Sequence, residues 1–146
     1  MEIKLKMNKT KSLIKLFEFY NFIQPVQANL LTVSEMELLS VFCTLPEKYR
    51  HSMFSIHGKR KVIQEYKSLF GKTLSNVNLN NKVYGLLDKG FLFRDEDKVI
   101  YLKPFLRKAL DDVAKNNRIE FNVLIDVYED GELSGSNEAS SKGSRI

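Results

Sequence analysis

The chain has a single cysteine, Cys43, so no disulfide forms within it. Cys43 lies among apolar residues of a predicted helix, which indicates a small core residue. Long apolar runs are also missing, because Lys15, Glu18 and Asn21 interrupt the stretch 13–23 and no small-residue cleavage site follows it. We therefore expect neither a signal peptide nor a membrane span, and predict a cytoplasmic protein of a bacterium or a phage-infected host cell.

Motifs that carry enzyme chemistry are missing as well. His51 and His57 do not have the spacing of a zinc site. The stretches 58–59 and 71–73 lack the first glycine of a P-loop. No serine lies in a sequence motif typical of a nucleophile. We expect a protein that is not an enzyme and uses no cofactor or metal.

Positive charge is distributed unevenly along the chain. The net charge is +5 and the isoelectric point is about 9.2. Residues 32–115 hold fifteen basic and ten acidic side chains, residues 1–31 have a net charge of +3, and residues 116–146 have −3. A polyanion binder needs such a positive middle region. Solubility alone is the other explanation.

Helical patterns fill the first half of the chain. Apolar residues recur at helical spacing over 13–23, where a strand is the alternative and Pro25 ends the pattern. Thr32 with Glu35 has the form of a capping box before a helix that ends near residue 45, although Ser34 with Glu37 is a rival cap. A second helix is expected over 59–70.

Three stretches have the pattern of strands. Residues 2–7 alternate, with Ile3, Leu5 and Met7 on one face and Lys4 and Lys6 on the other, and residues 52–56 are a plausible short strand. Residues 118–128 alternate more regularly and need a partner, either residues 2–7 or a second copy of the chain. Residues 131–146 are rich in Ser, Gly and Glu and are expected to be a disordered tail.

The stretch 75–102 combines a helix with a hairpin. Ser75 has the position of an N-cap, and Gly90 supplies a left-handed stop after the apolar positions of one helical face. Residues 91–93 and 99–102 read as strands on either side of the charged turn 94–98. Pro104 then suits the first turn of a last helix.

This helix and its charged hairpin resemble the recognition helix and wing of a winged helix-turn-helix domain. The resemblance implies an α+β fold, with a three-helix core and a wing over residues 32–115. An N-terminal strand and helix would form an arm over 1–31, and a C-terminal strand would cover 116–130. It also implies that the strand at 52–56 pairs with the wing.

The resemblance suggests double-stranded DNA as the partner and a small transcriptional regulator as the function. Asparagine pairs with adenine in the major groove, apolar Val77 suits a thymine methyl group, and the cations suit phosphates. The run 59–61 is the densest basic stretch, and cations at a helix start oppose the dipole, which favours a functional reason for them. The residues expected at DNA are Lys59, Arg60, Lys61, Lys72, Ser75, Asn76, Val77, Asn78, Asn80, Asn81, Lys82, Tyr84, Arg94 and Lys98.

Other features of this stretch favour a structural role for these residues over DNA contact. Asparagines near a helix start also serve as caps and solvated side chains, Gly85 costs a helix about 1 kcal/mol, and Asp88 repels phosphate. Three acids at 95–97 separate Arg94 from Lys98, unlike a strongly basic wing. The hairpin turn is equally well explained as a solvated turn.

Two assembly hypotheses complete the prediction. Aromatic residues of the flanking segments suggest a homodimer that presents two helices to half-sites one turn apart. They are Phe17, Phe19, Tyr20, Phe22 and Phe121. The alternative to DNA binding is a protein-interaction or assembly adaptor, for example in a phage, which suits outward Val77 and Tyr84 and the acidic wing and tail.

Overall fold

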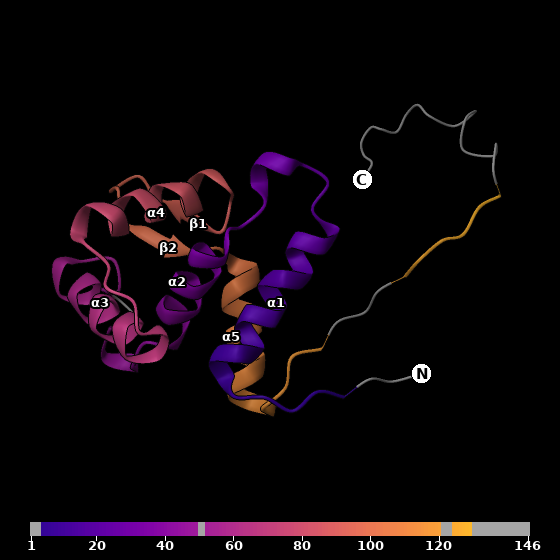
Figure 1. The fold of residues 1–146 in the computed structure, drawn as a ribbon, viewed down its shortest axis with the longest axis horizontal. Coiled ribbons are helices and arrows are strands. Elements are labelled where there is room, and N and C mark those ends of the chain that lie inside the picture. The colour runs from indigo at the N-terminus through magenta and orange to yellow at the C-terminus, as the bar shows by residue number, and fades with distance from the viewer. Residues whose placement is uncertain (1–3, 50–51, 121–123, 130–146) are drawn as a thin grey trace.

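The computed structural model describes residues 4–49, 52–120 and 124–129. Within them, five α-helices and one antiparallel two-stranded hairpin make an α+β fold (Figure 1). The elements are α1 (Lys9–Ile23), α2 (Val33–Thr44), α3 (Ile56–Phe70), α4 (Asn76–Asp88), β1 (Leu92–Arg94), β2 (Ile100–Leu102) and α5 (Pro104–Asn116), with short 3-10 turns at Gln27–Asn29 and Glu47–Tyr49.

Local capping explains where most helices begin and end. The capping box before α2 is confirmed, because Thr32 Oγ1 accepts from the Glu35 N–H and Glu35 Oε1 accepts from the Thr32 N–H. The rival cap at Ser34 is wrong. Ser75 caps α4, and after it Gly90 adopts a φ of 85° while the Phe91 N–H donates to the Leu86 carbonyl. This is a Schellman ending, and it turns the chain directly into β1.

Helix α3 starts earlier than the sequence predicts, and the predicted strand at 52–56 is wrong. Ser55 is the N-cap, accepting from the Gly58 N–H at 3.2 Å, so Ile56 is the first helical residue. Gly58 lies against the backbone of Ser52 and Met53, where an added Cβ would stand 2.5 Å from the Met53 carbonyl oxygen. Turns occupy 52–55 instead, and the hairpin has two strands in the described part of the chain.

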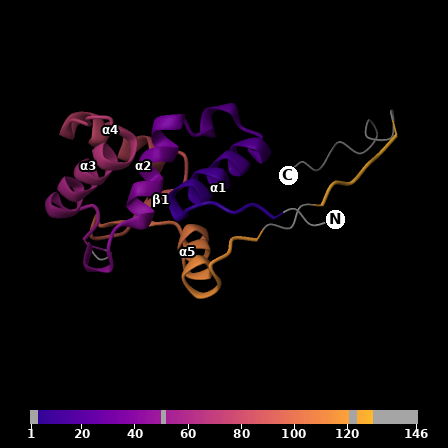
Figure 2. The same ribbon diagram turned by 60° about the horizontal axis from the view of Figure 1, so that its bottom comes forward.

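Helix α1 packs into the same core as the other helices. Leu13, Leu16 and Phe17 are buried with the core residues of α2, α3 and α4. Phe17 meets the ring of Phe91 edge-on at 6.4 Å, and Tyr20 meets Phe105 of α5 at 5.2 Å. In Figures 1 and 2, α1 and α5 form one side of the molecule while α3, α4 and the hairpin form the other, with α2 between them. Phe17 is fully buried within one chain, so it cannot contribute to the predicted dimer interface.

The hairpin has one face toward the core and one toward solvent. Leu92 pairs with Leu102 and both are buried, whereas the next pair, Phe93 and Tyr101, stacks on the opposite face with ring centroids 5.4 Å apart. Asp95 shapes the charged turn, because its Oδ1 accepts from the N–H groups of Asp97 and Val99. The predicted charged turn is therefore present, with one of its acids serving as a backbone acceptor.

The two terminal strand predictions fail where the structure describes them. Residues 4–7, 117–120 and 124–129 belong to no strand, and Asn116 is the last residue of α5. Residues 2–3, 121–123, 130 and the predicted tail 131–146 lie outside the described residues. A strand requires a paired neighbour, and within the described chain neither segment has one.

Two smaller findings complete the description. Cys43 is buried as predicted, and burial raises the pKa of its thiol to about 12. No helix in the described ranges is long and apolar enough to cross a membrane.

Candidate nucleic-acid interface

Helix α4 presents a polar, largely uncharged face to solvent. Its buried side is formed by Leu79, Val83 and Leu86, which are at most 2% exposed. The opposite line, at 3.6 residues per turn, runs through Val77, Asn81, Tyr84 and Asp88, all exposed. Asn76 and Asn80 flank this line on one side, and Asn78 and Lys82 flank it on the other. The expected exposure of Val77, Asn81, Tyr84 and Asp88 is confirmed, whereas Gly85, also expected to face outward, lies against Glu35 of α2.

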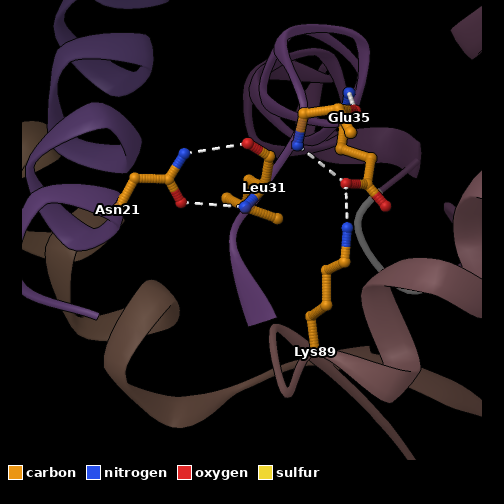
Figure 3. Close-up of polar contacts among 5 residues, drawn as sticks. Asn21, Leu31, Glu35 and Lys89 are labelled. Carbon is orange, nitrogen blue, oxygen red and sulfur yellow. Dashed lines mark hydrogen bonds and ion pairs between the residues drawn. The ribbon is translucent and has the colours of Figure 1, made fainter. Parts of the chain in front are cut away.

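A buried ion pair fixes α4 to the start of α2. Lys89 Nζ, just after α4, lies 2.5 Å from Glu35 Oε1, and both side chains are largely buried. Figure 3 shows this contact beside the capping interaction of the same carboxylate, and shows Asn21 bonded twice to the Leu31 backbone. No local sequence pattern predicts this pair, because Glu35 and Lys89 are 54 positions apart.

The same carboxylate explains the glycine inside α4. A Cβ built on Gly85 would stand 2.7 Å from Glu35 Oε2, so a larger residue would displace the carboxylate. Next to this contact lies an open pocket of about 380 Å³, lined by Thr32, Glu35, Asn78, Asn81 and Lys82. The pocket places Lys82 and two of the predicted asparagines beside the start of α2.

Helix α3 supplies a cation to one edge of the α4 face. Lys59 Nζ donates to Asn80 Oδ1 at 2.8 Å, so the predicted basic run reaches the predicted helix at this residue. Lys61 Nζ instead lies 3.4 Å from Glu65 Oε2, one turn further along α3. Because α3 begins at Ile56, the run lies beyond the first three helical residues, where opposition to the dipole is weaker. The position of these cations in the helix therefore does not by itself indicate a functional role.

The hairpin supplies a second cation near the other end of α4. The guanidinium of Arg94 lies 5.7 Å from the ring centroid of Tyr84, a cation–π contact. Lys98 is at the turn with a φ of 64°, and its side chain is exposed. Glu96 and Asp97 are exposed at the same tip. The hairpin therefore places one cation beside α4 at the end of β1, next to a turn of mixed charge.

Lys72 is committed to a different contact. Its Nζ lies 2.9 Å from Glu37 Oε1, the same atom that accepts from the Tyr66 hydroxyl at 3.2 Å. Burial, followed by the nearby Glu37 carboxylate, raises the pKa of Tyr66 to about 12. Lys72 thus ties the turn before α4 to α2, and its charge is largely balanced.

Four of the predicted cations consequently fall into two groups. Lys59 and Arg94 contact α4 through uncharged groups, and in the described part of the chain neither has a carboxylate partner. Lys61 and Lys72 each have one. The Lys61–Glu65 pair is an i, i+4 pair that the sequence spacing allows, whereas the contacts of Lys59, Arg94 and Lys72 depend on the tertiary packing.

Comparisons with known proteins add no assignment. No protein-family model matches the chain, and the comparisons with curated proteins and with solved structures give no match. Among the described residues, no three His, Cys, Asp or Glu side chains gather in a way that would hold a metal ion.

Proposed function

We propose that residues 32–115 form a winged helix-turn-helix domain that binds double-stranded DNA, with α4 in the major groove and the hairpin as the wing. The order α2, α3, α4, hairpin and α5 supports this proposal, and so does the direct turn from α4 into β1 at Gly90. A small transcriptional regulator is the role that suits such a domain.

One observation carries the proposal. Two cations from different elements, Lys59 of α3 and Arg94 of β1, lie against the exposed face of α4 without carboxylate partners in the described chain. A helix entering the major groove brings its flanks close to the phosphates of both strands. Cations in these positions would contact phosphate while the central side chains reach the bases.

Base contact falls to the central line and the N-terminal half of α4. Asn81 is exposed between Val77 and Tyr84, and its amide suits adenine N6 and N7. Val77 is 68% exposed and suits a thymine methyl group. Asp88, at the other end of the helix, directs the approach toward the N-terminal half because it repels phosphate.

A protein-interaction adaptor is the second candidate, and the same face favours it in one respect. Val77 and Tyr84 are both more than half exposed, and large exposed apolar groups are typical of protein interfaces. Exposed Glu96 and Asp97 also disfavour an approach of the hairpin tip to phosphate. Salt dependence separates the two functions, since phosphate binding releases counterions and therefore weakens steeply with salt.

The test is binding to random-sequence duplex DNA by fluorescence anisotropy at about 50 mM and about 200 mM salt. Lys59→Ala/Arg94→Ala removes the two cations at α4. We expect affinity to fall at least about tenfold at low salt and the salt slope to decrease by about two.

The matched control is Lys108→Ala/Lys115→Ala, which removes two exposed cations of α5. We expect this variant to keep the wild-type dependence of DNA affinity on salt concentration. Absence of binding at low salt by folded protein, or equal losses in the two variants, would reject α4 as the DNA-binding element. The adaptor would be supported instead if the chain captured a protein partner independently of salt and the Val77→Asp variant no longer bound that partner.

A further inference from the structure

We propose that two copies of this chain associate by exchanging short strands, with residues 4–8 of one copy pairing antiparallel to residues 124–128 of the other. This pairing is independent of the DNA-binding proposal. Both segments belong to no helix or strand and have no strand neighbour in the described chain.

The residues 124–128 expose apolar side chains that a solvated segment does not need. Ile125 is 80% exposed and Val127 is 90% exposed. In residues 4–8, Leu5 is 66% exposed and Met7 is 37% exposed. Residues 4–8 alternate between polar and apolar positions, and Ile125 and Val127 lie on either side of Asp126, which gives each segment one apolar face of a strand. Covering these faces removes apolar surface from water in both copies.

Charge complementarity favours this pair of segments and is compatible with the proposed register. Lysines recur at positions 4, 6, 9 and 11 around the first segment, whereas Asp126 is the acid within the second. When Lys6 is placed opposite Asp126 in an antiparallel pair, Leu5 faces Val127 and Met7 faces Ile125. Four apolar side chains then share one face, and the opposite charges meet on the other. A shift by one residue would set apolar side chains against charged ones.

The positions of the two segments favour pairing between two copies over pairing within one chain. Residues 4–8 precede α1 and residues 117–120 follow α5, and both leave the body at the same end (Figure 1). Beyond that point residues 124–129 extend away from the body and lie far from residues 4–8 (Figures 1 and 2). A two-fold axis near this end makes the exchange reciprocal, so each dimer contains two identical pairings.

Cross-linking tests which chains pair. Cys43 is buried, so introduced cysteines are the accessible thiols. Opposed Cα atoms of antiparallel strands have the separation that a disulfide requires. We expect a mixture of Lys6→Cys chains and Asp126→Cys chains to give a covalent dimer on a non-reducing gel. A Lys6→Cys/Asp126→Cys chain that closes only within itself, as a cross-linked monomer, would overturn the exchange.

Sedimentation equilibrium of the full chain tests the register. Asp126→Lys should raise the dimer dissociation constant about tenfold, because each dimer contains the pair twice. Lys6→Asp/Asp126→Lys should restore it. Asp111→Lys, the same charge change on exposed α5, should have no effect, and circular dichroism checks that every variant is folded. The proposal would be overturned by a wild-type chain that stays monomeric. It would also be overturned if neither Asp126→Lys nor Val127→Asp changed the dimer dissociation constant.

Discussion

Glu35 Oε2 lies too close to residue 85 to leave room for a side chain there, because a Cβ built on Gly85 would stand only 2.7 Å from it. The other carboxylate oxygen accepts from the Thr32 N–H and from Lys89 Nζ. One side chain thus caps α2, neutralises the lysine that follows α4 and requires a glycine inside α4. The orientation of α4 against α2 depends on this arrangement, and with it the direction of the exposed face.

Gly85→Ala should therefore destabilise the protein despite the better helix propensity of alanine. Alanine favours an exposed helix by about 1 kcal/mol, but displacing a buried paired carboxylate costs about 2 kcal/mol or more. We expect a net loss of about 1 kcal/mol in the free energy of unfolding, measured by urea denaturation.

In a Glu35→Ala background the sign should reverse, since no carboxylate remains near residue 85. The same Gly85→Ala change should then stabilise by up to about 1 kcal/mol relative to Glu35→Ala alone. An equal effect of Gly85→Ala in both backgrounds would show that the two residues are not coupled.

Asn21 should contribute measurably to stability through the segment that joins α1 to α2. Its amide donates to the Leu31 carbonyl and accepts from the Leu31 N–H, both at 2.8 Å (Figure 3). Asn21→Ala leaves both half-buried backbone groups without this partner, and we expect a loss of about 2 kcal/mol in urea denaturation. Gln27→Ala, an exposed change in the same segment, is the control. Similar losses in both variants would contradict the assigned role.

Tyr66 should make the protein sensitive to alkali. Burial and the Glu37 carboxylate raise its pKa from 10.0 to about 12 in the folded state. Between these values the folded state keeps a proton that the unfolded state has lost, so stability falls as the pH rises from 10 toward 12.

The measurement is the unfolding free energy across that pH range for wild type and Tyr66→Phe. We expect the wild type to lose on the order of 1 kcal/mol more than the variant. Tyr84→Phe, a change at an exposed ring, should follow the wild-type curve. Parallel curves for wild type and Tyr66→Phe would place the alkaline sensitivity elsewhere.

Asn81 and Lys59 should differ in what they contribute to DNA binding. Selection from random duplexes first identifies a preferred site. Asn81→Ala should then weaken binding to that site about tenfold and leave random-sequence binding unchanged, whereas Lys59→Ala should weaken both. No enrichment in the selection, or parallel losses in both variants, would refute base readout by Asn81.

Much of the fold and part of the site could be predicted because the relevant interactions are local. The capping box at Thr32, the cap at Ser75 and the left-handed stop at Gly90 each involve residues a few positions apart. The division of α4 into a buried and an exposed face follows from its periodicity alone. The start of α3 is less predictable from sequence, because Ser55 can act as an N-cap or lie within the stretch 52–56 that suits a short strand.

The sequence by itself thus determined the helices, the hairpin and the residues that α4 exposes, since each follows from contacts within one or two turns of chain. Only the tertiary structure decided which cations lie at α4, because Lys59, Arg94 and Lys72 meet partners from distant elements. It also decided that α1 belongs to the core and why residue 85 is glycine. Burial and ion pairing depend on which elements pack together, and no local pattern encodes that packing.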